Sequence, residues 1–364
     1  MTDNELAAVV QRELTRARGY DQDTLSAIRS QALDLYHGAA VAAAEGRVQA
    51  VSLDVADALH ATLAQIGPVV RSSGIEFEAM SQEDETQAQT ETDFVRVALE
   101  RSSAFNAIDD ACFDALLIGN GWLHCYVDER TLVTEQKFHG NLTPEQEYAL
   151  TSMDIPDTKV RLRSGKEYSV AIIEKVQRTL KVEVVPPENM LFSEQGSSFD
   201  LDELRFVARE RLYTAAQLRS KGISNDKIDA LQDANNDETG QRAREGALAN
   251  DGEYDAEQDA NRLKRVYCCY IRIQTGANRV ELRHVWIGQN VGDGLLLNEP
   301  ADHIPFICGS AIPMPHRITG TGFGQLLKQI QESKTHALRQ YLDNLTVMNG
   351  SRVAAVEGQV NMSD

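Results

Sequence analysis

A glycine-rich turn ahead of a long helical pattern is the first segment whose residue types could do chemistry. Gly320-Thr-Gly-Phe-Gly324 carries the glycines that let a backbone approach phosphate groups. A GxxxxGK[ST] phosphate loop also needs a lysine on the phosphates and a hydroxyl on Mg²⁺. Here Gln325 and Leu326 follow the last glycine, and no clear strand leads into the turn. The pattern favours a flexible hinge that enters a helix over a nucleotide site.

A run of alternating acids has the spacing of a calcium loop. The acids are Asp251, Glu253, Asp255, Glu257 and Asp259. An EF-hand loop needs glycine at its sixth position and a bidentate glutamate at its twelfth. Those positions hold Ala256 and Arg262. The run is therefore interpreted as a solvated charged segment.

The remaining residues of chemical interest form no recognisable site. The histidines and cysteines lack zinc-ligand spacing, and neither HExxH nor GxSxG occurs. The five cysteines are odd in number and include no CxxC pair, which indicates buried, reduced thiols. Trp122 and Trp286 lie in apolar strand patterns typical of core positions. We expect no catalytic residues, no cofactor and no metal, and hence no enzyme.

The charge balance limits the partners. The 364 residues include 55 acidic and 36 basic ones, a formal charge of −19. Such a chain repels nucleic acid at long range, which excludes sequence-specific duplex binding by a basic face but allows an acidic wall past which DNA slides. No apolar run is long enough to span a bilayer, and Met1–Glu5 lacks the features of a signal peptide. We expect no membrane association.

Hydrophobic periodicity predicts an α+β fold. Helices are expected at 5–18, 23–37, 53–69, 92–118 and 214–221, and another starts near the Thr143-Pro144 signature. Strands are expected at 121–128, 159–162, 169–177, 181–185, 204–211, 266–274 and 280–287. The stretch 81–91 is polar and acidic, and 233–261 has nine acidic and two basic residues with almost no apolar ones. The second stretch is predicted to be a solvated loop.

The last clear element is a helix from about 322 to 348, roughly 40 Å long at 1.5 Å per residue. Its apolar side includes Leu327, Ile330, Leu338, Tyr341 and Leu345, while Lys328, Thr335, Arg339 and Asp343 are among the polar residues around the rest. A long amphipathic helix with few partners in its own chain needs neighbours, which a ring of copies supplies.

Four stretches, in order, resemble the portal proteins of short-tailed, P22-like bacteriophages. They are Ser52–Asp57 (SLDVAD); Phe113–Trp122 (FDALLIGNGW); Pro186–Phe192 (PPENMLF) with Asp200–Ala208; and Pro315–Gly320 (PHRITG) with Gln329–Lys334 and Leu338–Asn344. No single stretch is a chemical signature, so the weight lies in their order and spacing across most of residues 50–350.

The resemblance implies a portal architecture. Residues 1–315 would form the wing, helical over 1–120 and strand-rich over 121–315. Residues 316–349 would carry the first stem helix, and 350–364 would begin the clip. The second stem helix, tunnel loop and crown of such proteins have no counterpart here, so we expect a truncated, split or partial sequence.

The resemblance also implies a function and partners. The protein would form a ring of twelve subunits at one capsid vertex of the virion, assembled in the host cytoplasm. Double-stranded DNA would pass through it during packaging and ejection without sequence-specific binding. The terminase large subunit, the major capsid and scaffold proteins and the tail adaptors would dock on it. The absent phosphate loop agrees with a motor chemistry that belongs to the terminase.

Residue roles follow from this reading of the helix. Subunit packing is assigned to Leu327, Ile330, Leu338, Tyr341 and Leu345. Contacts with DNA in the channel are assigned to Lys328, Lys334 and Arg339, because these side chains can touch phosphates. Terminase or adaptor contacts in the clip are assigned to Arg352 and Glu357.

Two alternatives remain open. One is another structural phage subunit, such as a head-tail adaptor or a scaffold-associated protein, which ring stoichiometry with a central channel would distinguish. The other is a nucleotide-dependent enzyme that uses Gly320–Gly324, which nucleotide-binding calorimetry would distinguish.

Overall fold

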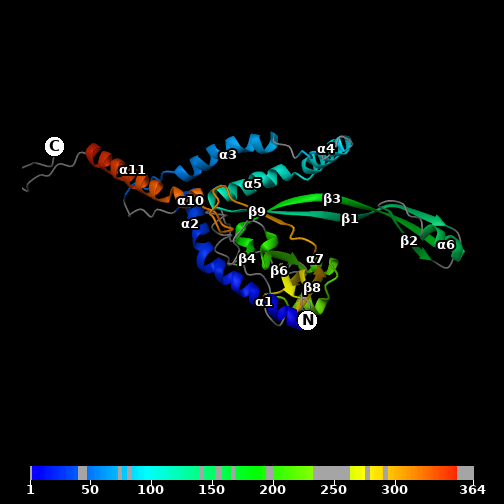
Figure 1. Cartoon of the computed structure of the whole chain (residues 1–364). Coiled ribbons are helices and arrows are strands. Elements are labelled where there is room, and N and C mark those ends of the chain that lie inside the picture. Colours follow the sequence, from blue (N-terminus) through cyan, green and yellow to red (C-terminus); the bar gives the residue numbers. More distant parts are fainter. Residues whose placement is uncertain are drawn as a thin grey trace, which may run out of the picture. The chain divides into compact units, whose positions relative to one another are not determined.

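The computed structural model describes residues 2–39, 47–72, 76–79, 84–139, 143–151, 158–164, 169–193, 201–232, 263–274, 279–289 and 294–350. The chain forms two compact units (Figure 1). Unit 1 comprises residues 1–69, 109–122 and 184–364, and unit 2 comprises 70–108 and 123–183. The predicted acidic loop 233–261 and the predicted clip residues Arg352 and Glu357 lie outside the described residues.

Unit 1 is built on an antiparallel sheet with the strand order β4-β5-β6-β7-β8. The strands are β4 (Met190–Phe192), β5 (Phe206–Thr214), β6 (Leu263–Gln274), β7 (Val280–Ile287) and β8 (Leu295–Pro300). Short 3₁₀ turns, η2 (Pro187–Asn189) and η3 (Leu201–Glu203), precede β4 and β5. Alternate residues of β6 point to opposite faces, and both faces of this strand are buried.

Helices cover this sheet. Leu6, Val10 and Leu14 of α1 (Asp3–Tyr20) pack against Tyr267 and Ile271 of β6. On the other face lie α7 (Ala215–Ser220) and α8 (Asn225–Ala230). The N-cap of helix α7 is Thr214, whose hydroxyl accepts from the backbone N–H of Gln217.

The helices of unit 1 form a second core. Helix α1 continues through a π-helical turn, η1 (Asp21–Leu25), into α2 (Ser26–His37). Leu33 and Leu35 of α2 are buried with residues of α3 (Asp54–Ser72) and α5 (Ala104–Leu117), and Phe323 of α10 (Phe323–Leu326) packs against this cluster. Helix α11 (Lys328–Asn349) follows α10 after a break at Leu327, so the helix predicted over 322–348 is interrupted. Its 22 residues span about 33 Å.

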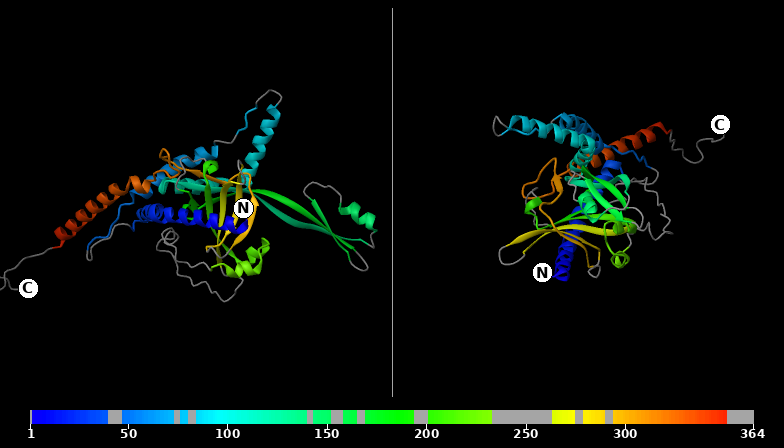
Figure 2. Two further views of the ribbon diagram at one scale, coloured as in Figure 1. Left: turned by 60° about the horizontal axis from the view of Figure 1, so that its bottom comes forward. Right: turned by 90° about the vertical axis from the view of Figure 1, so that its right-hand side faces the viewer.

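Unit 2 contains α4 (Glu85–Arg101) and most of a long β-ribbon. A four-stranded sheet has the order β2-β3-β1-β9, formed by β1 (Gly121–His139), β2 (Thr158–Ser164), β3 (Ser169–Val185) and β9 (Phe306–Gly309). The paired strands β1 and β3 form a twisted ribbon, and α6 (Pro144–Thr151) lies between β1 and β2 in sequence (Figure 2).

Four sequence expectations need correction here. The helix predicted over 92–118 is two helices, because Ser103 adopts a left-handed φ of 55° between α4 and α5. Helix α4 also begins inside the stretch 81–91 that looked like a polar connection. Strand β1 runs to His139 rather than 128, and β3 joins the two strands predicted at 169–177 and 181–185.

Candidate functional site

The face of α11 turned toward the rest of unit 1 is polar. Its fully or largely buried side chains are Gln331, Thr335 and Arg339, four residues apart, and Asp343 continues the same line half-buried. Residues four apart lie one above the other on a helix, so these side chains form one stripe. The stripe meets the extended segment 47–53 and the start of α3.

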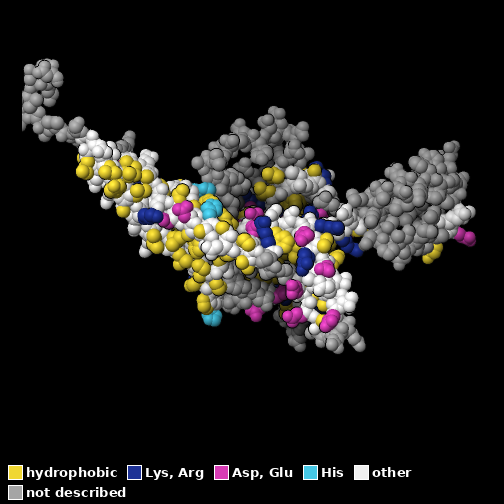
Figure 3. All heavy atoms as spheres, turned by 90° about the horizontal axis from the view of Figure 1, so that it is seen from above, with side chains coloured by type: hydrophobic (Ala, Val, Ile, Leu, Met, Phe, Trp, Pro, Cys, Tyr) yellow, Lys and Arg dark blue, Asp and Glu magenta, His cyan; other side chains and the backbone are white. Residues whose placement is uncertain are grey.

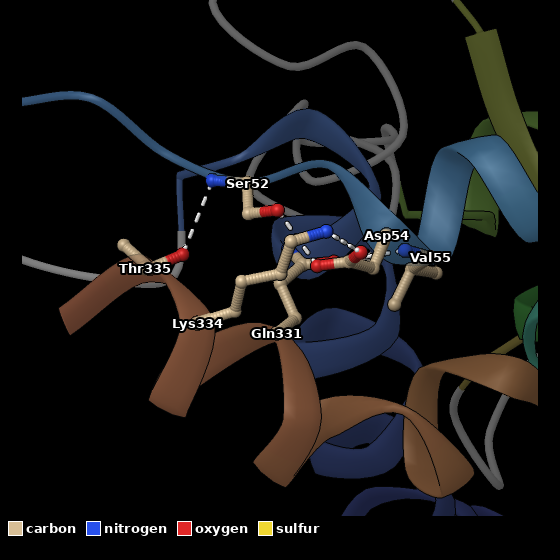
Figure 4. Close-up of polar contacts among 6 residues, drawn as sticks. All are labelled: Ser52, Asp54, Val55, Gln331, Lys334 and Thr335. Carbon is tan, nitrogen blue, oxygen red and sulfur yellow. Dashed lines mark hydrogen bonds and ion pairs between the residues drawn. The ribbon is translucent and has the colours of Figure 1, made fainter. Parts of the chain in front are cut away.

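The first two side chains of the stripe bind backbone groups (Figure 4). Oε1 of Gln331 accepts from the backbone N–H of Val55 at 2.9 Å, and its Nε2 donates to the carbonyl of Leu35 at 2.8 Å. Oγ1 of Thr335 accepts from the N–H of Ser52 at 3.1 Å. Gln331 and Thr335 are both 0% exposed, so these bonds satisfy polar groups that water does not reach.

The next two side chains repeat the pattern. Nε of Arg339 donates to the carbonyl of Ala50 at 2.9 Å. Oδ1 of Asp343 accepts from the backbone N–H of Val48 at 3.1 Å, and Oδ2 of Asp343 lies 3.5 Å from Nη1 of Arg47. The helix and the segment run antiparallel, because later helix positions meet earlier segment positions.

Four residues of the helix α11 and two residues of the extended segment 47–53 advance by nearly the same distance. Four helical residues rise about 6.0 Å, and two extended residues rise about 6.4–6.8 Å. Positions 48, 50 and 52 therefore meet positions 343, 339 and 335 in turn. We call these contacts, with the Gln331–Val55 bond, the polar ladder.

An ion pair lies beside the polar ladder. Nζ of Lys334 contacts Oδ1 of Asp54, and the hydroxyl of Ser52 donates to Oδ2 of Asp54 at 2.7 Å (Figure 4). The hydrogen bonds from Lys334 and Ser52 hold the pKa of Asp54 below its ordinary value. The side chain of Lys334 is 60% exposed, so water screens the pair and its contribution to stability is small.

Large apolar side chains of α11 are exposed outside the polar stripe. Ile330, Tyr341 and Met348 are 57%, 62% and 81% exposed, and Leu338 and Val347 are also exposed. Hydrophobic side chains gather along α11 as it runs toward the C-terminus (Figure 3). Three of the five predicted packing residues, Ile330, Leu338 and Tyr341, thus lie on an open face. Leu345 is half-buried, and Leu327 packs against the helical core of its own unit.

The three predicted DNA contacts have different surroundings. Lys328 is half-buried and forms no ion pair with the described residues. Lys334 is exposed and paired with Asp54. Arg339 is only 8% exposed, so its side chain is not available for a contact with DNA in the single subunit. The amphipathic pattern misassigned it because the partner of this arginine is the carbonyl of Ala50, which no helical periodicity encodes.

The glycine-rich turn packs against its own chain. A Cβ on Gly322 would lie 2.2 Å from the carbonyl oxygen of Leu117, and one on Gly324 would lie 2.4 Å from Cβ of Ala32. The glycines thus allow close packing of backbone and helix. The glycine-rich turn, which the sequence indicated to be a flexible hinge, is instead a place where two backbone segments pack tightly against each other.

The cysteines and the other possible metal ligands among the described residues indicate no reactive site. All five cysteines are unpaired thiols, and burial raises the pKa of Cys268 to about 11 and that of Cys308 to about 12, so both are protonated at neutral pH. Across the described ranges, no three His, Cys, Asp or Glu side chains gather as metal ligands, and no helix has the length and apolarity to cross a membrane.

Comparison with known families decides the assignment. The model of the phage SU10 portal protein family matches residues 6–364, nearly the whole chain. The chain belongs to the SU10 portal protein family. No curated protein matches it. The match confirms the resemblance to podovirus-type portal proteins and makes the chain a structural component of a phage virion.

Two of the resemblance stretches meet in this portal protein. Ser52, Asp54 and Val55 belong to the first, and their partners belong to the stretch around Gln329–Lys334 or follow it directly. Sequence reasoning missed Gln331, Thr335 and Asp343 as structural residues. Their four-residue spacing was visible, but the backbone groups that they bind lie about 280 to 295 positions earlier.

Proposed function

We propose that this portal protein forms a ring of twelve subunits at one capsid vertex, and that DNA enters and leaves the head through the ring. The observation that carries the proposal is the two-faced helix α11. The polar ladder binds one face to the same chain, while Ile330, Leu338 and Tyr341 stay exposed on the other. In a ring, α11 is the first stem helix, and a neighbouring subunit or a second stem helix covers that face.

The charges support a conduit. At −19 the chain does not hold DNA tightly, which suits a wall past which DNA must slide. Lys328 and Lys334 are the residues of α11 that we assign to transient phosphate contacts, because both are accessible and Arg339 is not. Replacing either lysine by glutamine should weaken the salt dependence of DNA retention without breaking the ring.

The ring would also serve as a docking platform. We assign contacts with the terminase large subunit and the tail adaptors to the clip, with Arg352 and Glu357 as candidate residues. The major capsid and scaffold proteins would surround the wing. The motor chemistry belongs to the terminase, and the portal protein itself is not an enzyme.

The test is the assembly state of the full-length protein. Native mass spectrometry should show a closed oligomer of about twelve copies, and electron microscopy of the same sample should show rings with a central channel. Monomers or dimers alone at high protein concentration would refute the proposal. Closed rings that form only with another phage protein would favour an adaptor or a scaffold-associated subunit.

A further inference from the structure

Two stretches of the family pattern cross each other in unit 1 and have no part in the proposed stem contact. The backbone N–H of Gly320 donates to the carbonyl of Gly119 at 3.1 Å. Gly119 has a left-handed φ of 109°, and a Cβ there would lie 2.5 Å from the carbonyl oxygen of Gly320. Only glycine fits this crossing, which holds Asn120 and the segment 314–321 in fixed positions.

The crossing borders a partly enclosed cavity of about 220 Å³. Tyr20 and Ile28 supply apolar wall on either side of the π-helical turn η1, and π-helical turns are frequent at functional sites. Asn120, Arg317, Thr319 and Thr321 supply polar wall. The cavity is smaller than most drug-sized pockets but large enough for one side chain with ordered water.

Asn120 is the strongest sign of a ligand. It is 4% exposed and lines the cavity, and within the described part of the chain its amide has no hydrogen-bond partner. An amide in so confined a place is satisfied by protein, by water or by a ligand. An amide offers two donors and an acceptor, which suits a carboxyl or carboxamide group.

The charges favour an anion. Arg29 also lines the cavity, but its Nη2 already binds Oδ2 of Asp21 at 2.6 Å, and both side chains are buried. Arg317 is exposed at the wall and forms no ion pair among the residues that the structure describes. Arg317 is therefore the one charged lining residue of the cavity that has no ion-pair partner among the described residues. Its fork geometry suits the two oxygens of a carboxylate.

We propose that this cavity, the Asn120 pocket, receives the carboxylate of an aspartate or glutamate side chain from a second copy of the chain. The methylenes of that side chain would contact Tyr20 and Ile28, and its carboxylate would meet Arg317, Asn120 and the threonine hydroxyls. A second copy can supply such a side chain, because each copy carries 55 acidic residues. A DNA phosphate is excluded, because a duplex is far too wide to reach a residue 4% exposed.

The test is site-directed cross-linking in the full-length protein. A photoreactive benzoyl-phenylalanine replaces Met314, which lines the pocket and is 42% exposed. Unlabelled and ¹⁵N-labelled copies are mixed before assembly, so mass spectrometry separates cross-links between copies from those within one. We expect mixed-isotope cross-links to peptides that contain an aspartate or glutamate. Cross-links only within single copies, or to peptides without an acid, would overturn the proposal.

Variants identify the pocket as the cause. Arg317→Gln should lower the between-copy yield about tenfold, the size of one lost charge-assisted hydrogen bond. Asn120→Asp keeps the shape of the side chain but its negative charge repels a carboxylate, so this variant should also lower the between-copy yield. Arg12→Gln, at an exposed arginine on α1, is the control and should change nothing. An unchanged between-copy cross-linking yield in Arg317→Gln would refute a carboxylate in the pocket. Calorimetric binding of ATP that is lost in Arg317→Gln would refute it as well.

The inference depends on the proposed function in one respect: both require that copies of the chain associate with one another. Native mass spectrometry of the same samples separates the two: rings without between-copy cross-links at Met314 refute the pocket alone. Cross-links in a protein that forms no closed ring refute the ring and support the pocket.

Discussion

Gln331 is the side chain that connects three parts of unit 1. Its amide joins α11 to the first turn of α3 through Val55 and to the end of α2 through the carbonyl of Leu35. Both bonds are buried, and no water competes for them. Because a buried donor or acceptor that loses its partner keeps its desolvation cost, this residue should be more sensitive than its exposed neighbours.

We predict that Gln331→Leu lowers the free energy of unfolding by about 2–3 kcal/mol, because it leaves the buried N–H of Val55 without a partner. It also removes one hydrogen bond from the carbonyl of Leu35, which keeps the bond from the N–H of Gly38. Urea unfolding followed by circular dichroism measures the change. Gln340→Leu, at an exposed position of α11, is the matched control and should stay within about 0.5 kcal/mol of the parent. Equal effects of both substitutions would mean that the polar ladder contributes little.

His284 makes the stability depend on pH. Burial and the nearby charge of Lys221 lower its pKa to about 4, from an ordinary 6.5. Nε1 of Trp286 donates to Nε2 of His284 at 2.8 Å, so the ring is neutral and accepts there. The folded-state pKa is depressed, so the stabilisation is complete above pH 6.5 and is lost as the pH falls toward 4.

We predict that the parent loses about 2–3 kcal/mol more stability between pH 7.5 and pH 4.5 than His284→Gln does, since glutamine takes up no proton. Urea unfolding at several pH values measures the difference. His303→Gln, at an exposed histidine, should follow the parent. Parallel curves for the parent and His284→Gln would show that the ring takes up a proton in the folded protein.

At the scale of elements, α11 has two faces with different tasks. The polar ladder determines how the helix is turned about its own axis, since a rotation would place Gln331, Thr335 and Arg339 in water and bury apolar groups against backbone amides. The apolar face is thereby held outward. This orientation makes the exposed face, rather than the ladder, the part of α11 available to other subunits.

We predict that Leu338→Asp prevents ring assembly and leaves the subunit folded. Leu338 is 37% exposed in the single chain, so the charge costs little there, but in a subunit contact it would lie buried without a partner. Sedimentation velocity and circular dichroism measure assembly and folding. Gln340→Asp adds the same charge at an exposed polar position and should leave rings intact. Intact rings with Leu338→Asp would place the contact elsewhere.

The backbone crossing near α10 should tolerate no added methyl group. A Cβ on Gly322 would lie 2.2 Å from the carbonyl oxygen of Leu117, and backbone can yield only by moving a helix. We predict that Gly322→Ala lowers the melting temperature by at least about 8 °C or yields insoluble protein, a loss of several kcal/mol. Gly309→Ala, which has open space around it, should be nearly neutral. A stable Gly322→Ala protein would show that the crossing can open.

At the scale of the whole molecule, the protein is an acidic component that works by assembly. Its family is structural, and the glycine turn that resembled a phosphate loop faces its own backbone. We predict no ATP hydrolysis above background in the purified protein, with or without DNA, because Gln325 and Leu326 stand where a phosphate loop has lysine and serine or threonine. A coupled assay measures it. Activity that stays with the protein through two different purification steps would contradict the proposed division of labour with the terminase.

Local patterns predicted what depends on neighbours in sequence. The α+β character, the helix that starts near Pro144, the short helix over 214–221 and the apolar stripe of α11 were all predicted, because helix starts and periodicity are short-range properties. The resemblance to portal proteins was also a property of the sequence alone, and the family comparison confirmed it.

Tertiary structure decided what depends on distant partners. Periodicity placed Thr335 and Arg339 on the polar side of the helix, yet both are buried, since segment 47–55 supplies backbone partners for polar side chains. Likewise, the length of β1 and the union of two predicted strands in β3 follow from pairing between strands. Asn120 was visible in the sequence only as part of the resemblance stretch Phe113–Trp122. Its burial beside Arg317 arises only where residues 119 and 320 cross, and no local propensity encodes such a contact.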